Sequence, residues 1–447
     1  MVDQRRNLSP HRAMQHPTPP NPGSAAAVAL LLLLAGLLLP ASSAAAGDAK
    51  RWIAMSMERL CARPALSGFD AQLLLDGSWL LEETAWPDPA SPQRTTLRLA
   101  LPDGGELTVE RRAVGGQLRQ FRAAYSSFDG ERLVPAMQAI ADGACTVQSA
   151  RAMRAGPGAW RHLDQLDGDL STLRWSETLQ APWPEGADPG GVRVAFVDSG
   201  LAYDLPQFRQ RLARDANGTP LGYDFWDDDP WPYDGDVSRG AFFPIRHGTA
   251  VASIFVREAP EAAILPFRYP RPDMTRMADL VARASASGAR ILAMPLGSRS
   301  PDEWHAFEAA LRTHDILAIV SAGNDGRDID QSPVYPATLT AENLITVTSA
   351  DQFGRLAQGS NWGGSGVDIM LPAENLEIVD FRGARGVASG SSYAVPRLAA
   401  LAARILSDDP GLSTAELKAA IFARAAPSPF ERDGALAVGW IPDPLAD

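Results

Sequence analysis

The chain is poor in cysteine and has no clustered positive charge beyond its N-terminus, and each shortage excludes a class of protein. Only Cys61 and Cys145 occur in 447 residues, and neither has a histidine-bearing motif near it, so a cysteine nucleophile is not expected. The formal net charge is −12. Because phosphate contacts need clustered Lys and Arg, nucleic acid is not an expected partner. The sequence also has no internal repeat.

Residues 1 to 46 are typical of a signal peptide. Positive charge precedes an apolar stretch at residues 25 to 39, and small residues before Gly47 fit a cleavage site. About 15 apolar residues are too few for an ordinary membrane span. The segment therefore predicts export to a secreted or periplasmic location, with no stable membrane insertion once the leader is removed.

Three alternatives for this segment stay open. In the first alternative, the segment is a membrane anchor that is not cleaved. In the second, Arg5 and Arg6 belong to a twin-arginine signal, although they lie far from the apolar stretch. In the third, Met14 is the true start of the chain.

The two cysteines form an even pair in a chain expected to be exported, which indicates a Cys61–Cys145 disulfide. This bridge would close a loop of about 85 residues and disfavour the unfolded chain by roughly 4 kcal/mol through loop entropy. Two buried thiols are the alternative.

Composition and hydrophobic pattern indicate a globular protein with two regions. The chain is 45% hydrophobic and 21% charged, enough for a full core. Residues 47 to 155 predict a small α+β domain, with a helical pattern at residues 133 to 141. The string Ala155-Gly156-Pro157-Gly158 is typical of a linker.

From residue 160 to 447, apolar strands alternate with amphipathic helices. This alternation predicts an α/β domain with a mostly parallel central sheet covered by helices on both faces. Functional sites in such domains collect at the carboxyl ends of the strands.

Two residues in this second region suit proton transfer. Asp198 follows the apolar strand expected at residues 192 to 197, where its carboxylate can orient a histidine ring. His247 precedes Gly248 and Thr249, which allow a helix to begin directly after it. Taken singly, Asp198 is better explained as a turn cap and His247 as a structural histidine.

Two further residues suit acyl transfer to a serine. Asn324 follows a buried strand and can aim its amide N–H at a developing oxyanion, or else occupy a left-handed turn. Ser392 follows Gly390 at the expected start of a helix, whose free N–H groups lie beside its hydroxyl. A plain helix cap at Ser392, or at Ser391 instead, is the alternative. It is improbable that all four residues have only these structural roles and yet occur in this order along the chain.

These motifs resemble the subtilisin-like serine proteases (subtilases, peptidase family S8). The resemblance runs from about residue 160 to the C-terminus, or about three fifths of the chain, and its strings are specific. The similar strings are Val194-Ala195-Phe196-Val197-Asp198-Ser199-Gly200, His247-Gly248-Thr249-Ala250-Val251-Ala252-Ser253, Ser321-Ala322-Gly323-Asn324 and Gly390-Ser391-Ser392-Tyr393-Ala394-Val395-Pro396.

The resemblance implies a subtilisin-like three-layer fold and a role for each residue. Asp198 is the orienter, His247 the general base and acid, and Ser392 the nucleophile; Asn324 and the Ser392 N–H form the oxyanion hole. Peptide substrates are expected to add as a strand along five residues: Leu296, Gly297, Ser321, Ala322 and Gly323.

The chain departs from the family pattern in three places. Ser391 stands where the family usually has threonine, and Pro295 stands where it usually has serine. Proline removes an N–H and stiffens the substrate-binding edge, so substrate preference is left open. The segment between Asp198 and His247 is also long.

That segment is rich in carboxylates and aromatic rings. Close spacing of its aspartates suits a structural calcium ion, which many relatives bind, although no loop signature fixes the ligands. A solvated acidic loop beside the cleft is the alternative. The aspartates are Asp224, Asp227, Asp228, Asp229, Asp234 and Asp236.

Together these features predict a secreted, monomeric serine endopeptidase that acts on protein or peptide substrates and needs no cofactor for catalysis. A catalytically inactive peptide-binding protein of the same fold, and a peptide ligase, are the alternatives. Residues 47 to 155 are expected to be a cleaved propeptide of a zymogen or a retained accessory domain.

Overall fold

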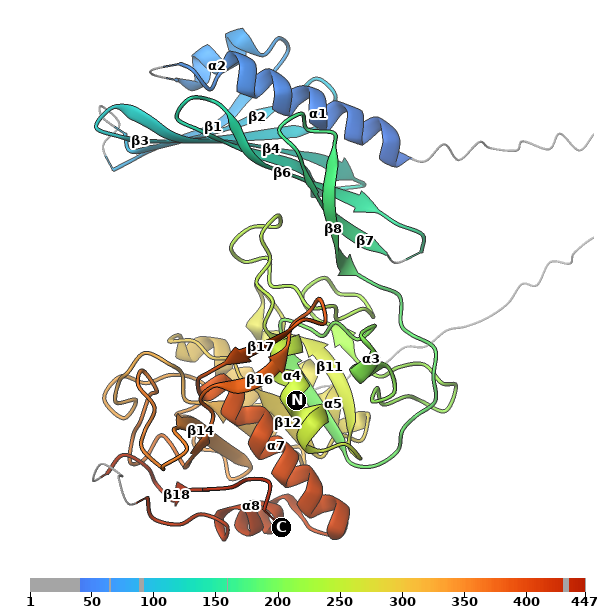
Figure 1. Ribbon diagram of the computed structural model, residues 1–447, viewed down its shortest axis with the longest axis vertical. Helices are drawn as coiled ribbons and strands as arrows, with labels where there is room; N and C mark the ends of the chain where they lie inside the picture. The colour runs from blue at the N-terminus through green and yellow to red at the C-terminus, as the bar shows by residue number, and fades with distance from the viewer. Residues whose placement is uncertain (1–40, 64–65, 88–91, 159, 429–433, 447) are drawn as a thin grey trace, which may run out of the picture. The chain divides into compact units, whose positions relative to one another are not determined.

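The computed structural model describes residues 41 to 447, except 64–65, 88–91, 159, 429–433 and 447. The expected signal peptide therefore lies almost wholly outside the described residues. Two large sheets of different design follow one another along the described chain, an antiparallel one and then a parallel one (Figure 1).

The first sheet is an antiparallel meander of eight strands, in which each strand pairs with the next one along the chain. Helix α1 (Ala41–Arg59) and helix α2 (Gly68–Leu74) lie on one face of it (Figure 1). The strands are β1 (Trp79–Trp86), β2 (Arg94–Ala100), β3 (Glu106–Val114), β4 (Gln117–Asp129), β5 (Arg132–Asp142), β6 (Val147–Ala155), β7 (Arg161–Leu166) and β8 (Leu173–Gln180).

Alternation of buried and exposed residues explains why these segments are strands. In β2, Leu97 and Leu99 are buried while their neighbours point away, which is the period of two that a half-covered sheet requires. Buried Trp52 and Ile53 of α1 belong to the same core as the β2 leucines. The small α+β region is thus built on one helix-covered sheet face.

Two sequence predictions for this region are wrong. The helix expected at residues 133 to 141 is strand β5, because pairing with β4 and β6 overrides its alanine-rich helical pattern. The linker expected at residues 156 to 158 is a hairpin turn, closed by the Gly156 N–H, which donates to the Trp160 carbonyl. The sheet therefore continues to Gln180, beyond the domain boundary expected at residues 155 to 160.

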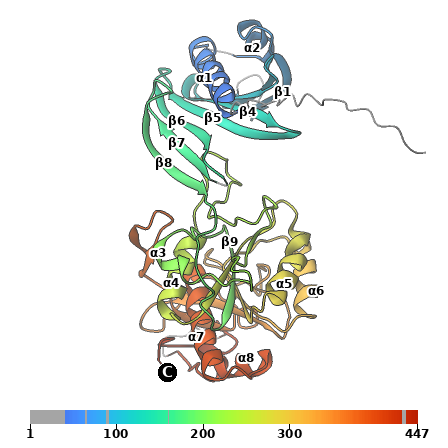
Figure 2. The same cartoon turned by 90° about the vertical axis from the view of Figure 1, so that its right-hand side faces the viewer.

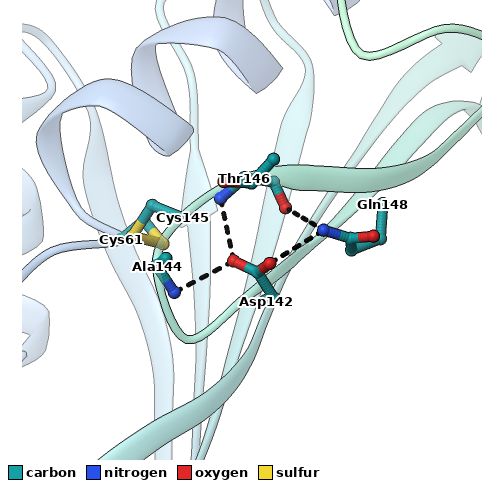
Figure 3. Close-up of a disulfide and its surroundings, with 6 residues drawn as sticks. All are labelled: Cys61, Asp142, Ala144, Cys145, Thr146 and Gln148. Atoms are coloured by element: carbon teal, nitrogen blue, oxygen red, sulfur yellow. Dashed lines mark hydrogen bonds between the residues drawn. A yellow bond between two sulfur atoms is a disulfide. The ribbon is translucent and has the colours of Figure 1, made fainter.

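The predicted Cys61–Cys145 disulfide is present (Figure 3). Cys145 lies in the turn between β5 and β6, with a positive φ of 63°. Asp142 fixes that turn by accepting the backbone N–H groups of Ala144 and Thr146 at 2.9 and 3.0 Å. The bridge ties the segment after α1 to this hairpin.

The second sheet is parallel throughout, with the strand order β10-β11-β9-β12-β13-β14-β15-β18. Its central strands β9, β12 and β13 are mostly apolar and, apart from Arg193, buried, as the sequence predicts for a sheet covered on both faces. The strands are β9 (Arg193–Asp198), β10 (Tyr223–Asp224), β11 (Ala263–Arg268), β12 (Ile291–Met294), β13 (Leu317–Ser321), β14 (Leu344–Ala350), β15 (Ile369–Pro372) and β18 (Gly439–Trp440).

Helices cover both faces of this sheet and make three layers (Figure 2). Alternate residues of β9 separate the two cores: Val194 packs with α4 (Gly248–Glu258) and α7 (Ser391–Asp408), and Ala195 with α5 (Met277–Ala286) and α6 (His305–Leu311). The predicted α/β fold class is confirmed.

Shorter elements complete this region. They are α3 (Pro206–Arg209), the 3-10 turns at Met274–Arg276 and Pro301–Trp304, the antiparallel pair β16 (Leu376–Val379) and β17 (Arg385–Ala388), and α8 (Thr414–Phe422). Ser413 and Glu416 form a capping box that starts α8. Among the described residues, no helix has the length and apolar character needed to cross a membrane.

Candidate active site

The four predicted site residues all lie where strands of the parallel sheet end or where helices begin. Asp198 is the last residue of β9, and Asn324 follows the end of β13 by three residues. His247 precedes the first residue of α4, and Ser392 is the second residue of α7. Carboxyl strand ends of a parallel sheet lie on one edge, so the fold gathers residues from distant parts of the sequence.

Asp198 and His247 form a close pair. Nδ1 of His247 lies 2.9 and 2.8 Å from the two carboxylate oxygens of Asp198. The Asp198 side chain is 7% exposed and the His247 ring 31% exposed. With Nδ1–H donating to the carboxylate, Nε2 of the neutral ring carries no proton, so His247 is oriented as a base.

The surroundings of His247 change its pKa in opposing directions. Burial lowers it, whereas the charge and hydrogen bond of Asp198, and then the charge of Asp234, raise it. The net effect raises the pKa of His247 above its ordinary value. The site is therefore built to stabilise the imidazolium form that appears when the ring accepts a proton.

Asp234 is a second carboxylate at this site. It is fully buried, and its two oxygens accept from the Ser199 hydroxyl at 2.6 Å and from the Thr249 N–H at 3.0 Å. The Ser199 hydroxyl oxygen in turn accepts the N–H groups of His247 and Gly248 at 3.1 and 3.0 Å. A negative charge at the start of α4 thus holds the backbone that carries His247.

Sequence reasoning gave Asp234 only a place in the acidic segment, and gave Ser199 no role beyond its motif. No spacing distinguishes Asp234 from the aspartates around it, because its partners come from two other segments, at Ser199 and at residues 247 to 249. Burial, which the sequence does not display, is what separates it from a solvated carboxylate.

Ser392 lies two residues after Gly390, a glycine with a positive φ that caps the start of α7. Gly390 has a φ of +126°, and a Cβ there would lie 3.0 Å from Oδ1 of Asn324. Glycine is therefore required on both counts. Ser392 itself is half-buried, and the ring of its neighbour Tyr393 lies 6.0 Å from the His247 ring.

Ser392 and Asn324 line one cavity of about 380 Å³. Four of the five predicted substrate-binding residues line it too, namely Leu296, Gly297, Ser321 and Gly323. Ala322 does not line it: the residue is fully buried, and its carbonyl accepts from the side-chain amide of Asn361. Pro295, the departure from the family pattern, lies on the wall.

Hydrogen bonds from Ser391 fix the orientation of the Asn324 side chain. Its side-chain oxygen accepts the Ser391 N–H at 2.9 Å and the Ser391 hydroxyl at 3.0 Å. This places the carbonyl end of the amide against α7, and the NH₂ end on the other side of the group. Asn324 can therefore offer a hydrogen-bond donor in the cavity that it shares with Ser392.

Several aspartates of the acidic segment bind other side chains of the protein. Arg268 binds Asp224 and Asp227 at 2.9 and 2.6 Å, and burial is the main reason that the pKa of Asp224 is raised to about 6. Asp228 pairs with Arg276, and Asp236 accepts from the Tyr269 hydroxyl.

Calcium needs six to eight oxygen ligands free to converge on it. In the part of the chain that the structure describes, no group of three or more His, Cys, Asp or Glu side chains is arranged to hold a metal ion.

The fold and site together define an α/β protein with a carboxylate–histidine pair and a helix-borne serine at one sheet edge. The sequence model of the subtilase family (peptidase S8) matches residues 190 to 439, more than half of the chain. The chain belongs to the subtilase family. The match begins just after the antiparallel sheet ends.

Individual relatives agree with this membership. The chain is 28% identical over 255 residues to a thermophilic serine proteinase of Bacillus sp. (strain AK1), covering 54% of this chain and 57% of that protein. It is 30% identical over 253 residues to the halolysin-like extracellular serine protease Nep of Natrialba magadii, covering 54% of this chain and 44% of that protein. The chain thus spans about half the length of these relatives.

A solved structure of a cold adapted subtilisin-like serine proteinase is also similar. It has a TM-score of 0.47 and 22% identity, and the match covers 60% of this chain and 93% of that one.

Proposed function

We propose that this protein is an exported serine endopeptidase that hydrolyses peptide bonds through an acyl-enzyme. The observation that carries the proposal is the Asp198–His247 pair at the same sheet edge as a cavity lined by Ser392 and Asn324. Membership of a family whose relatives are serine proteases supports it.

In the first half of the proposed reaction, Ser392 becomes acylated. Its Oγ attacks the scissile carbonyl carbon while Nε2 of His247 accepts the hydroxyl proton. The tetrahedral oxyanion accepts hydrogen bonds from the Asn324 amide and the Ser392 N–H. His247 then gives its proton to the leaving amine, and the C–N bond breaks.

The second half hydrolyses the ester. His247 accepts a proton from water as the water oxygen attacks the acyl carbon, and the same donors hold the second oxyanion. Return of the proton to Ser392 Oγ releases the carboxylic acid product. The Asp198 carboxylate stabilises the imidazolium in both halves.

The proposed substrates are proteins or peptides bound as an added strand. Such a strand would lie along Leu296–Gly297 on one side and Ser321–Gly323 on the other, with a side chain entering the cavity. Pro295 has no N–H to offer a substrate carbonyl, so binding on that side depends on the residues after it.

The region before the peptidase domain is proposed to be a propeptide, with a retained accessory domain as the alternative. Its compact helix-covered sheet supports a role as a folding unit. The Cys61–Cys145 bridge is less expected in a disposable segment and favours the retained domain. Mass spectrometry of active secreted protein tests this. Since the antiparallel sheet ends at Gln180, a propeptide predicts an N-terminus between residues 181 and 191, whereas a start near Gly47 contradicts it.

Hydrolysis of a fluorogenic peptide library tests the activity itself. The wild type is expected to cleave peptides, and Ser392→Ala to lose cleavage by a factor on the order of 10⁶. Ser389→Ala is a matched control, because Ser389 is exposed and bonds only the Asn375 N–H in this network. Peptide binding without cleavage by the wild type would favour the inactive binding protein, and product joining in excess amine would favour the ligase.

A further inference from the structure

Behind the Asn324 amide lies a pair of buried serine hydroxyls. Ser321, the last residue of β13, is 5% exposed, and Ser391, the first residue of α7, is fully buried. Their Oγ atoms are 2.7 Å apart. Because a buried hydroxyl is costly to leave without a hydrogen bond, this contact strongly constrains the orientation of both serine side chains.

The direction of each hydrogen bond in this pair follows from counting protons. The Ser391 hydroxyl donates to Oδ1 of Asn324, an oxygen that can only accept. A hydroxyl has one proton, so the bond between the two serines must be donated by Ser321. The Ser321 oxygen meanwhile accepts the Gly323 N–H at 3.1 Å.

We propose that Ser321 is a positioning residue for the oxyanion-binding amide of Asn324. It fixes the rotamer of the Ser391 side chain, and Ser391 holds the carbonyl end of the Asn324 side chain. The anchor is rigid, because every residue of β13 is buried in the middle of the parallel sheet. This inference rests on the proposed function.

The serine at position 391 makes such an anchor necessary. Serine lacks the second Cβ substituent that restricts the side-chain rotamers of threonine, so its hydroxyl turns more freely. A hydrogen bond from Ser321 supplies the orientation that branching would otherwise supply. The loss of one hydroxyl at position 321 should therefore loosen Asn324 without touching the Ser391 N–H bond.

A double-mutant cycle between Ser321→Ala and Asn324→Ala tests the proposal. In the wild-type background, Ser321→Ala is expected to lower kcat about tenfold with KM nearly unchanged, because a loosely held oxyanion donor acts on the transition state. In the Asn324→Ala background, the same substitution is expected to change kcat less than twofold.

Ser349→Ala is the matched control, since Ser349 is a fully buried serine on the adjacent strand β14 with its hydroxyl on Glu374. The kcat of the Ser349→Ala variant should stay at the wild-type value. Ser391→Ala, which keeps the backbone bond to Asn324, should show the same dependence on Asn324 as Ser321→Ala, and serves if that variant folds poorly.

Equal losses from Ser321→Ala with and without Asn324, or no loss at all, would overturn the positioning role. So would a rise in KM with unchanged kcat, which would show Ser321 to be a simple substrate contact. Failure of the proposed function is distinguishable, because the wild type itself would then cleave no peptide.

Discussion

The two sheets of this protein have the same number of strands and opposite consequences for chemistry. In the antiparallel meander, each strand pairs with its neighbour in sequence, so contacts are local and turns alternate between the two edges. In the parallel sheet, every strand ends at the same edge, and helices α4 and α7 begin there. Only the second design gathers Asp198, His247, Asn324 and Ser392, which span almost two hundred residues.

The two regions are also held together differently. The antiparallel sheet has a helix-covered face and adds a covalent bridge at Cys61–Cys145. The parallel sheet has two apolar cores, one on each face, and both cysteines lie outside it. Substitutions should therefore divide into those that stop catalysis and those that weaken only the first region.

The largest expected effect after loss of the nucleophile comes from Asp198→Asn. An amide at this position forces the other ring tautomer on His247, so kcat should fall by about 10⁴. Peptide hydrolysis kinetics measure the loss, and an unchanged circular dichroism spectrum serves as the control for folding. A loss below tenfold would contradict the role assigned to the pair.

Removal of the Asn324 amide should cost less. Asn324→Ala takes away one oxyanion donor and is expected to lower kcat by about 10² to 10³ with KM nearly constant. Asn361→Ala is not a suitable control, because that buried amide supports the same loop. Asn343→Ala is suitable, since its amide binds carbonyls at the opposite ends of the strands.

The pH dependence should show the raised pKa of His247. The general base must be neutral, so kcat/KM is expected to fall tenfold per pH unit below that pKa, which lies above the ordinary value of 6.5. Asp234→Asn removes a charge that raises the pKa, and the acid limb should then move to lower pH. A limb that stays in place or moves upward would show that Asp234 does not act on the ring.

Loss of the disulfide should have the smallest effect on turnover. Cys61→Ser with Cys145→Ser is expected to destabilise the antiparallel region by about 4 kcal/mol, because the unfolded loop regains entropy. Thermal unfolding followed by the exposure of Trp52 in the core of that region would report this. Once the protein is active, kcat should match that of the wild type; a large fall would make the first region part of the catalytic unit.

Motif strings and apolar runs were enough to predict the parallel sheet and the Asp198–His247 contact. Each catalytic string ends or begins an element, so the fold places the strings once the elements are known. The helix predicted at residues 133 to 141 is wrong because a short alanine-rich run is compatible with both the helical and the strand period. Only pairing with neighbouring strands decides between the two.

The hydrogen bonds of Asp234 and Ser321 could not be predicted for a different reason. They join side chains that are 35 and 70 residues apart in sequence. Asp234 has no motif of its own, and the string that contains Ser321 does not indicate its bond to Ser391. The roles of these two residues depend on their burial and on their hydrogen-bond partners in the folded protein. No residue pattern along the chain indicates either.

Our proposal requires that Ser392, and no other serine, is the nucleophile that His247 activates. Treatment with a fluorophosphonate, followed by peptide mass spectrometry, tests this assignment. One label per molecule, located on Ser392 and lost in Ser392→Ala and in His247→Ala, is the predicted result. Labelling of Ser391 instead, or equal labelling of the wild type and Ser392→Ala, would contradict the account.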